Sequence, residues 1–157
     1  MLIIDIPGYE TIKVKNVVFD FNGTLAVDGI LVDGVKEKME ELSNRGINIF
    51  ILTADTFGTV SDQCRHLPVE IEIFSKENVS GSKKRFVEKI GPETTITVGN
   101  GRNDLAMFEE SILSIVVIGK EGCCTKSIRV ADIMVNNPID ALELLLKNDR
   151  ICATLRT

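Results

Sequence analysis

The sequence predicts an open, doubly wound α/β fold in three layers, with helices on both faces of a mainly parallel sheet. Short apolar, β-branched runs alternate along the chain with amphipathic segments of helical period, and this alternation is typical of parallel βαβ units. Polar clusters directly follow three of the runs, at Asp20, at Thr53 and at Asn100–Asp104. Because ligands of such sheets bind beyond the carboxyl ends of the strands, these clusters predict one shared site.

Length and composition predict a single domain over residues 1–157. A chain of this size can bury a sufficient core without disulfides or structural metals, and 44% hydrophobic with 26% charged residues is ordinary for a globular protein. The four cysteines lack CxxC spacing, which favours reduced thiols over a zinc site. The only histidine, His66, leaves no basis for a Ser-His-Asp triad.

The charge pattern excludes several classes of partner. The net charge is −5, and the lysines and arginines are spread along the chain, so the basic surface that nucleic acids or anionic membranes need is missing. The first residues lack a basic signal-peptide region, and no apolar run approaches the length of a membrane span. We therefore expect a cytoplasmic protein that binds neither nucleic acid nor membrane.

The first elements lead into the site. Leu2–Ile6 and Thr11–Val14 flank a Pro-Gly turn and predict either a small hairpin or an edge strand before the buried strand Val17–Asp20. An Asp-Gly pair between apolar residues follows, and it predicts a flap hairpin over the site at about residues 25–33. Asp33 is then expected to cap a helix that ends at Gly46.

The remaining elements continue the alternation of strands and helices. Either Ser80 or Ser82 is expected to cap the helix that Gly91-Pro92 ends, and Asn137 with Pro138 is expected to open the last helix. In order, the expected elements are the strand Ile47–Leu52, a helix with Phe57, Val60 and Cys64 on one side, the strand Val69–Phe74, a helix with Phe86, Val87 and Ile90 inward, the strand Thr94–Val98, a short helix through Leu105 and Phe108, the strand Leu113–Ile118, a helix around Cys124 and Ile128, the strand Asp132–Val135, and a helix that buries Leu142, Leu145 and Leu146.

The polar clusters share one chemistry. Asp20 would stand at the end of a buried strand, before an Asn22-Gly23-Thr24 turn whose backbone N–H groups suit an anion. Thr53 offers a hydroxyl, Lys83 or Lys84 a positive charge at a helix start, and Asn100, Asn103 and Asp104 hard oxygen atoms. A dianionic phosphoryl group bound with Mg²⁺ would use all of these groups.

Four ordered motifs carry a family resemblance. The run Asp20-Phe21-Asn22-Gly23-Thr24 resembles the DxDGT signature of the haloacid dehalogenase superfamily, with Thr53 as its second motif and Lys83 as its third. The fourth, GNGRND at Gly99–Asp104, resembles the GDGxND of P-type ATPase phosphorylation domains. The match covers about residues 15–147 and implies a Rossmann-like sheet, dependence on Mg²⁺, and a phosphorylated small molecule as substrate.

The resemblance also implies roles for individual residues. Asp20 would attack phosphorus and form an aspartyl phosphate. Lys83 is preferred over Lys84 because Val87 follows it by four residues, as in the ATPase pattern. The implied catalytic residues are Asp20, Asn22, Thr53 and Lys83, the implied phosphate-binding residues are Gly23, Thr53, Ala54 and Lys83, and the implied Mg²⁺ ligands are Asp20, the backbone carbonyl of Asn22, and the side chain of Asp104 or Asn100.

Two positions depart from the family pattern. Asn22 stands where the phosphatases have an aspartate that protonates the leaving group, and losing such a group typically slows catalysis ~10²–10⁴-fold. Asn100 stands where a Mg²⁺-binding aspartate is usual, which predicts weaker metal binding. We therefore expect a slow phosphatase that acts best on acyl or aryl phosphates, with Asp28 and Asp55 as candidate substitute acids.

The spacing of the motifs bears on the alternatives. Too few residues separate Asp20 from Thr53, and Thr53 from Lys83, for a cap domain. Capless members of the superfamily often close the site with a second subunit, so a homo-oligomer is consistent with the resemblance. The alternative function is a catalytically impaired phosphate- or protein-binding module with a regulatory role, including a regulatory partner of a membrane ATPase.

Overall fold

The computed structural model describes residues 1–157 and is built on a six-stranded sheet of order β10-β9-β8-β3-β6-β7. Every neighbouring pair in this sheet is parallel, which confirms the predicted doubly wound α/β fold. The chain runs outward from β3 through β6 and β7 and then returns to the other side of β3, so strand order reverses beside β3. The strands are β3 (Asn16–Asp20), β6 (Asn48–Thr53), β7 (Glu70–Ile73), β8 (Thr95–Gly99), β9 (Leu113–Val117) and β10 (Ile133–Val135).

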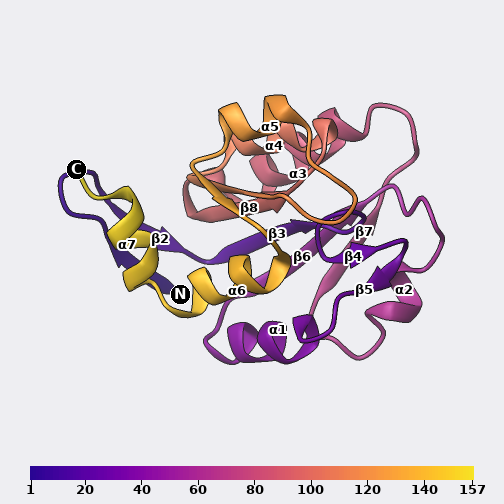
Figure 1. The fold of residues 1–157 in the computed structure, drawn as a ribbon, viewed down its shortest axis with the longest axis horizontal. Helices are drawn as coiled ribbons and strands as arrows, with labels where there is room; N and C mark the ends of the chain where they lie inside the picture. The colour runs from indigo at the N-terminus through magenta and orange to yellow at the C-terminus, as the bar shows by residue number, and fades with distance from the viewer.

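Helices cover both faces of the sheet (Figure 1). One layer holds α1 (Val35–Asn44) and α6 (Pro138–Leu146), and the opposite layer holds α3 (Val79–Ile90), α4 (Leu105–Glu110) and α5 (Thr125–Val130). Apart from the helices, the connections between the strands of the main sheet hold nothing larger than one short hairpin, in line with the expected absence of a cap. None of the helices combines the length with the apolar composition that crossing a membrane requires.

The central strand β3 decides which layer its aspartate faces. Val17 and Phe19 belong to the apolar cluster that includes α1 and α6, whereas Val18 belongs to the cluster formed with α3 and α4. Because successive side chains of a strand point to opposite faces, Asp20 shares the side of Val18. The carboxylate at the end of β3 therefore meets the layer that contains α3.

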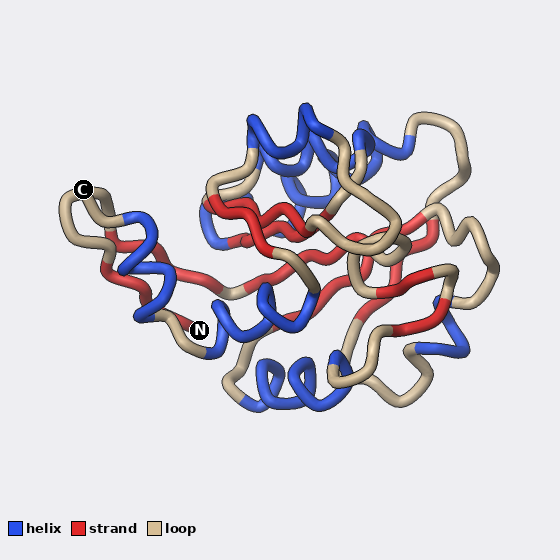
Figure 2. The backbone as a smooth tube through the Cα atoms, viewed as in Figure 1, coloured by secondary structure: helices blue, strands red, loops and turns tan.

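The N-terminal segment forms the hairpin that was one of the two expected alternatives. The strands β1 (Leu2–Asp5) and β2 (Thr11–Val14) pair antiparallel with each other and stand apart from the main sheet (Figure 2). The C-terminal helix α7 (Asp149–Leu155) packs on this hairpin, with the Cys152 thiol 3.1 Å from the backbone oxygen of Asp5. Both ends of the chain thus lie together at one end of the molecule.

The flap forms where the Asp-Gly pair predicts it. The strands β4 (Ala26–Val27) and β5 (Ile30–Leu31) pair antiparallel, and the two turn residues between them, Asp28 and Gly29, have φ of 51° and 76°, as a type I′ turn requires. The Asp28 N–H donates to Glu121 Oε1 at 2.7 Å. The tip of the flap is therefore fixed to the segment after β9.

Two predicted helix caps are wrong. The N-cap of α1 is Gly34, with φ of 86° and no side-chain bond, rather than Asp33, because the chain enters the helix through a left-handed turn that glycine favours. The N-cap of α3 is Asn78, whose side chain accepts the Gly81 N–H. Asn78 takes the left-handed conformation that asparagine tolerates, and Ser80 and Ser82 lie inside the helix instead.

The second predicted helix is much shorter than expected. Only α2 (Val60–Gln63) is helical, and Phe57 is 49% exposed rather than packed inward. The Asp55 carboxylate accepts the N–H groups of Thr59 and Val60 at 3.0 and 3.2 Å. This local bond holds the chain in a turn, so the helix begins three residues later than Phe57.

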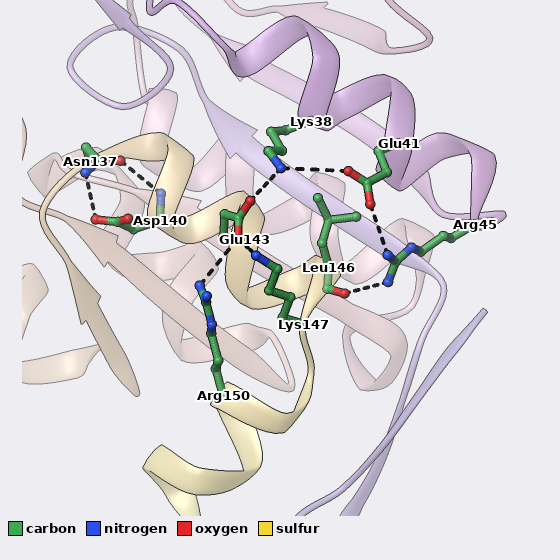
Figure 3. Close-up of polar contacts among 9 residues, drawn as sticks. All are labelled: Lys38, Glu41, Arg45, Asn137, Asp140, Glu143, Leu146, Lys147 and Arg150. Carbon is green, nitrogen blue, oxygen red and sulfur yellow. Dashed lines mark hydrogen bonds and ion pairs between the residues drawn. The ribbon is translucent and has the colours of Figure 1, made fainter.

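Ionic contacts join α1, α6 and α7 on the surface (Figure 3). Glu143 of α6 lies 2.5 Å from Lys38 of α1 and 3.4 Å from Arg150 of α7, and it also pairs with Lys147. Arg45 donates to the backbone oxygen of Leu146 at 2.6 Å. The start of α6 has the predicted cap, since Asn137 Oδ1 accepts the Asp140 N–H at 2.9 Å, and the predicted end of α1 at Gly46 is also found, with φ of 75°.

Candidate active site

The three polar clusters meet because they follow adjacent strands. Asp20 and Thr53 end β3 and β6, and Asn100 follows the last residue of β8, while β3 pairs with both of the other strands. Their carboxyl ends open on a cavity of about 390 Å³, within the range of small-molecule sites. The cavity is lined by Asp20, Asn22, Thr53, Ala54, Thr56, Asn100, Gly101, Arg102 and Asn103.

A buried ionic cluster lies at the base of this cavity. Lys83 is fully buried, and its Nζ donates to Asp20 Oδ1 at 2.6 Å and to Asp104 Oδ1 at 2.7 Å. Its position follows from the helix, because Val87 one turn later on the same face packs into the apolar cluster under α3. Lys84 points outward and pairs with Glu110 at 3.1 Å. The structure thus places Lys83 rather than Lys84 beside Asp20.

Burial and charge set the protonation of this cluster. Burial raises the pKa of Asp20 to about 6, the Lys83 charge opposes this, and the Asp104 charge adds to it. Burial alone would lower the pKa of Lys83, but the charges of Asp104 and Asp20 outweigh that effect and raise it. The lysine therefore stays charged at neutral pH, where one ammonium faces two carboxylates.

Asp104 supports both Lys83 and the loop after β8. Its Oδ1 accepts from Lys83, and its Oδ2 accepts the N–H groups of Asn100 and Gly101 at 3.0 and 2.8 Å. Both oxygens are thus engaged within the protein, and the residue is fully buried. Of the two alternative ligands after β8, Asn100 lines the cavity and Asp104 lies beneath it.

The Asn100 amide makes one contact that a carboxylate could not make. Its Nδ2 donates to the backbone oxygen of Gly122 at 3.0 Å, and its Oδ1 lies 3.2 Å from the Thr24 hydroxyl, which is also 3.1 Å from Asp20 Oδ2. An aspartate would set a negative oxygen against the Gly122 carbonyl. The structure thus provides a physical reason for asparagine at this position.

The turn after Asp20 is more closed than the sequence predicts. Gly23 has φ of 80°, as expected, and a Cβ there would lie 2.3 Å from Asn100 Nδ2. However, the N–H of Gly23 donates to Ala26, and those of Thr24, Leu25 and Ala26 all donate to the backbone oxygen of Phe21. The expected supply of free N–H groups from these residues is therefore missing, because the turn into the flap uses them.

Asn22 has a buried side-chain oxygen without a partner. Asn22 lines the cavity, and its Oδ1 accepts no hydrogen bond from the protein. Such an orphaned acceptor costs about 1–3 kcal/mol when buried, so a donor or a cation at this place would be stabilising. The amide has no proton to release at neutral pH, unlike the carboxylic acid it replaces.

The residues around the cavity fit a hard cation. They offer the Asp20 carboxylate together with amide and carbonyl oxygens of Asn22 and Asn100, which is the donor chemistry that Mg²⁺ prefers. No three His, Cys, Asp or Glu side chains converge in a metal-binding group anywhere in the chain. An ion here would thus be held by a mixed set of oxygen atoms.

The Thr53 hydroxyl can donate into the cavity, whereas the two candidate substitute acids, Asp28 and Asp55, do not line it. Thr53 Oγ1 accepts the Asp55 N–H at 2.9 Å, which leaves the hydroxyl proton free to point into the cavity. The Asp55 carboxylate is occupied by the N–H groups before α2, and Asp28 lies at the flap tip. Neither aspartate lines the cavity, so the structure does not support either as a proton donor.

Several residues of the site were not singled out from the sequence. Thr24 contacts both Asp20 and Asn100 through its hydroxyl. Its place in the first motif was a signal that it belongs to the site. Arg102 lies inside the fourth motif and lines the cavity. The segment Gly119–Cys124 holds Asn100 in two ways: Gly122 accepts from the side-chain amide, and the Cys124 N–H donates to the Asn100 backbone oxygen at 2.8 Å. This segment contains no motif that could reveal these contacts.

Two proteins of one organism match parts of the chain in sequence. No family model matches the chain. The uncharacterized protein MJ0073 of Methanocaldococcus jannaschii is 36% identical over 94 residues, which are 57% of this chain and 99% of that protein. A soluble P-type ATPase-like phosphatase of the same organism is 26% identical over 126 residues, or 79% of this chain, but the chain spans about half of its length, 46%.

A solved structure shares the fold over nearly the whole chain. It is the 3-deoxy-D-manno-octulosonate 8-phosphate phosphatase of Moraxella catarrhalis, determined with a magnesium ion, a phosphate ion and KDO. The TM-score is 0.73 at 19% sequence identity, and the match covers 91% of this chain and 94% of the other. At this identity the likeness concerns the fold.

Proposed function

We propose that the chain is a member of the haloacid dehalogenase superfamily and a Mg²⁺-dependent phosphatase that acts through an aspartyl phosphate on Asp20, which its sequence likeness to the soluble P-type ATPase-like phosphatase supports. The observation that carries the proposal is the buried Asp20–Lys83–Asp104 cluster at the base of the cavity. Burying ions costs several kcal/mol each before pairing, and a sheet needs no such cluster at this place for its stability. A catalytic task explains why it is there.

The chain's own residues supply the steps of transfer. An oxygen of the ionised Asp20 forms a bond to phosphorus while the bond from phosphorus to the leaving-group oxygen breaks, and that oxygen departs with the electron pair. Lys83 uses two of its three N–H groups on Asp20 and Asp104, so one remains for a phosphoryl oxygen. Thr53 donates its hydroxyl proton to another. Water then attacks the phosphorus of the aspartyl phosphate, which releases phosphate and restores Asp20.

The metal would bind in the cavity, directly above the Asp20–Lys83–Asp104 cluster. Asp20, Asn22 and Asn100 would supply oxygen ligands. Asp104 would not bind the metal itself but would position Lys83 and the loop that contains Asn100. When bound, Mg²⁺ offsets negative charge on the transferring phosphoryl group. With a neutral amide at position 100, we propose that the affinity for the metal is lower than in a site with a further carboxylate.

The choice of leaving group follows from Asn22. Its amide donates no proton to a departing oxygen, and neither Asp28 nor Asp55 lines the cavity. Turnover would therefore be slow with alkyl phosphates and faster with acyl or aryl phosphates, whose oxygen leaves without protonation. The soluble P-type ATPase-like protein and the Moraxella protein are both named phosphatases, which supports phosphorylated compounds as the substrates. For this chain we propose a phosphorylated small molecule.

The test combines turnover with detection of the intermediate. The protein is assayed with acetyl phosphate, p-nitrophenyl phosphate and glycerol 3-phosphate, with Mg²⁺ or with EDTA, and the peptide that contains Asp20 is examined for phosphate by mass spectrometry. We expect metal-dependent turnover that Asp20→Asn abolishes, and faster hydrolysis of glycerol 3-phosphate in Asn22→Asp. Turnover that survives Asp20→Asn would refute the mechanism. Binding of phosphate without turnover or labelling would favour the impaired, regulatory binding module instead.

A further inference from the structure

A second cavity continues the active site along the α3–α4 layer. Its volume is about 540 Å³, and it shares Arg102 and Asn103 with the cavity that contains Asp20. Its wall is otherwise formed by Ser80 of α3 and by Leu105, Ala106 and Glu109 of α4. A substrate whose phosphoryl group reaches Asp20 would thus extend across Arg102 into this second space.

Arg102 is the free positive charge of the active-site cavity. Among the residues that line that cavity it is the only cation. Lys83 is buried beneath the cavity, and its charge is paired with two carboxylates. The Arg102 side chain is exposed and forms no hydrogen bond or ion pair within the protein. Its five N–H donors are therefore available to a ligand.

The backbone beneath Arg102 is held in place. Arg102 opens the 3₁₀ turn Arg102–Asp104, whose last residue accepts the N–H groups of Asn100 and Gly101. On the other side, the Ser127 hydroxyl donates to the Gly101 oxygen at 2.8 Å. A side chain anchored on a rigid turn loses less freedom when it binds, which favours a binding role.

We propose that Arg102 binds a carboxylate of the substrate, so that the preferred substrates are phosphate monoesters of hydroxy acids. The proposal rests on the proposed function, because it assigns the part of the substrate that lies beyond the phosphoryl group. The planar guanidinium can donate two parallel hydrogen bonds to a carboxylate, and its single positive charge balances the single negative charge of that group. Glu109 also lines the second cavity, and its charge repels a dianionic phosphate more strongly than a singly charged carboxylate.

The test compares two ligands that differ in this one group. In 3-phosphoglycerate a carboxylate replaces the terminal hydroxymethyl group of glycerol 3-phosphate. Because alkyl phosphates should be turned over slowly, each is measured as a competitive inhibitor of p-nitrophenyl phosphate hydrolysis. In the wild type we expect 3-phosphoglycerate to bind about tenfold more tightly, the contribution of one charge-assisted contact.

Variants then assign the preference to Arg102. Arg102→Ala should bring the ratio of the two inhibition constants near one, and Arg102→Lys should leave part of it, since an ammonium keeps the charge but not the fork. The matched control is Arg129→Ala, because Arg129 is also exposed and forms no ion pair, but lines neither cavity. The control should keep the wild-type ratio.

The outcomes separate this proposal from the proposed function. Equal inhibition constants in the wild type, or a ratio that Arg102→Ala leaves unchanged, would overturn the role of Arg102 even if turnover is normal. If no phosphate ester is hydrolysed, calorimetric titration with the same two ligands still decides, and a preference lost in Arg102→Ala would support the site while the catalytic proposal fails. Tighter binding of 1,3-propanediol bisphosphate than of 3-phosphoglycerate would overturn the assignment of a carboxylate.

Discussion

Two networks of carboxylates and positively charged side chains in this protein have opposite properties. At the surface, Glu143 faces Lys147, Lys38 and Arg150, and the hydrogen bonds from Lys147 and Lys38 lower its pKa to about 2. At the base of the cavity, Asp20 shares a single lysine with another carboxylate, and burial raises its pKa to about 6. The surface carboxylate has more positive partners than its charge requires, and it links three helices. The buried carboxylate shares one positive charge with a second carboxylate, so it can still bind a cation or attack an electrophile.

The largest expected effect is that of removing the shared lysine. Lys83→Met leaves Asp20 and Asp104 buried without a counter-charge, which should lower the free energy of unfolding by about 3–5 kcal/mol at neutral pH and abolish turnover. Urea unfolding measures the first and the phosphatase assay the second. Lys84→Met is the matched control, since the Lys84 side chain is half-exposed and its loss should change stability by less than about 0.5 kcal/mol. Similar losses in the two variants would contradict the buried network.

The second prediction concerns pH. The folded-state pKa of Asp20, about 6, exceeds its ordinary value of 3.8, so the folded protein retains a proton that the unfolded chain releases between these values. Asp20 thus favours folding at low pH, and this contribution is lost as the pH rises through that window. Asp20→Asn should become more stable than the wild type as the pH rises from about 4 to 7, by about 2 kcal/mol or less. A stability difference that does not vary with pH in urea titrations would exclude the raised pKa.

The third prediction tests the Asn100 amide. Asn100→Asp loses the bond to Gly122 and sets two oxygens against each other, so without metal it should be destabilised by about 1–2 kcal/mol. Added Mg²⁺ should raise its melting temperature more than that of the wild type, because a carboxylate strengthens the metal site. Asn103→Asp is the control, since Asn103 lines the same cavity but its side chain bonds to nothing. Equal melting temperatures for both variants without metal would remove the structural role of Asn100.

The smallest effect is expected at the surface network. Glu143→Gln should destabilise the protein slightly above about pH 4.5, and the difference should disappear as the pH falls towards 2, because the lowered pKa of Glu143 stabilises the fold only while the group is ionised. The loss should shrink in about 0.5 M KCl, which screens exposed charges. Glu40→Gln, at an exposed position of α1 without an ion pair, should show neither dependence. A salt-independent loss would mean that packing rather than charge is lost.

The parts of the site that were predictable from the sequence are those set by periodicity. The alternation of β3 and the four-residue spacing from Lys83 to Val87 place a carboxylate and an ammonium on the same side of the sheet, and the structure brings them within 2.6 Å. The order of apolar runs likewise predicts the parallel sheet. These features depend on residues close in sequence, or on rules that hold for all parallel sheets.

The parts that were not predictable depend on contacts between distant loops or on competing local bonds. The bond from Asn100 to Gly122 joins two loops, and no pattern in the sequence relates them. The N–H groups after Asp20 are consumed by the turn into the flap, a detail of backbone geometry. The delayed start of α2 results from the Asp55 carboxylate, whose competition with the helix cannot be weighed from propensities alone.

The packing of α7 on the N-terminal hairpin has a consequence for the order of folding during synthesis. The contact of Cys152 with Asp5 spans 147 positions. The hairpin is therefore among the first segments to be synthesised, but the helix that packs on it is among the last. Until then the side of β1 and β2 that packs against Ile151 is without its cover. Ribosome-bound chains that stop before Asp149 should therefore expose this hairpin to proteases and chaperones, while the later release of α7 closes it.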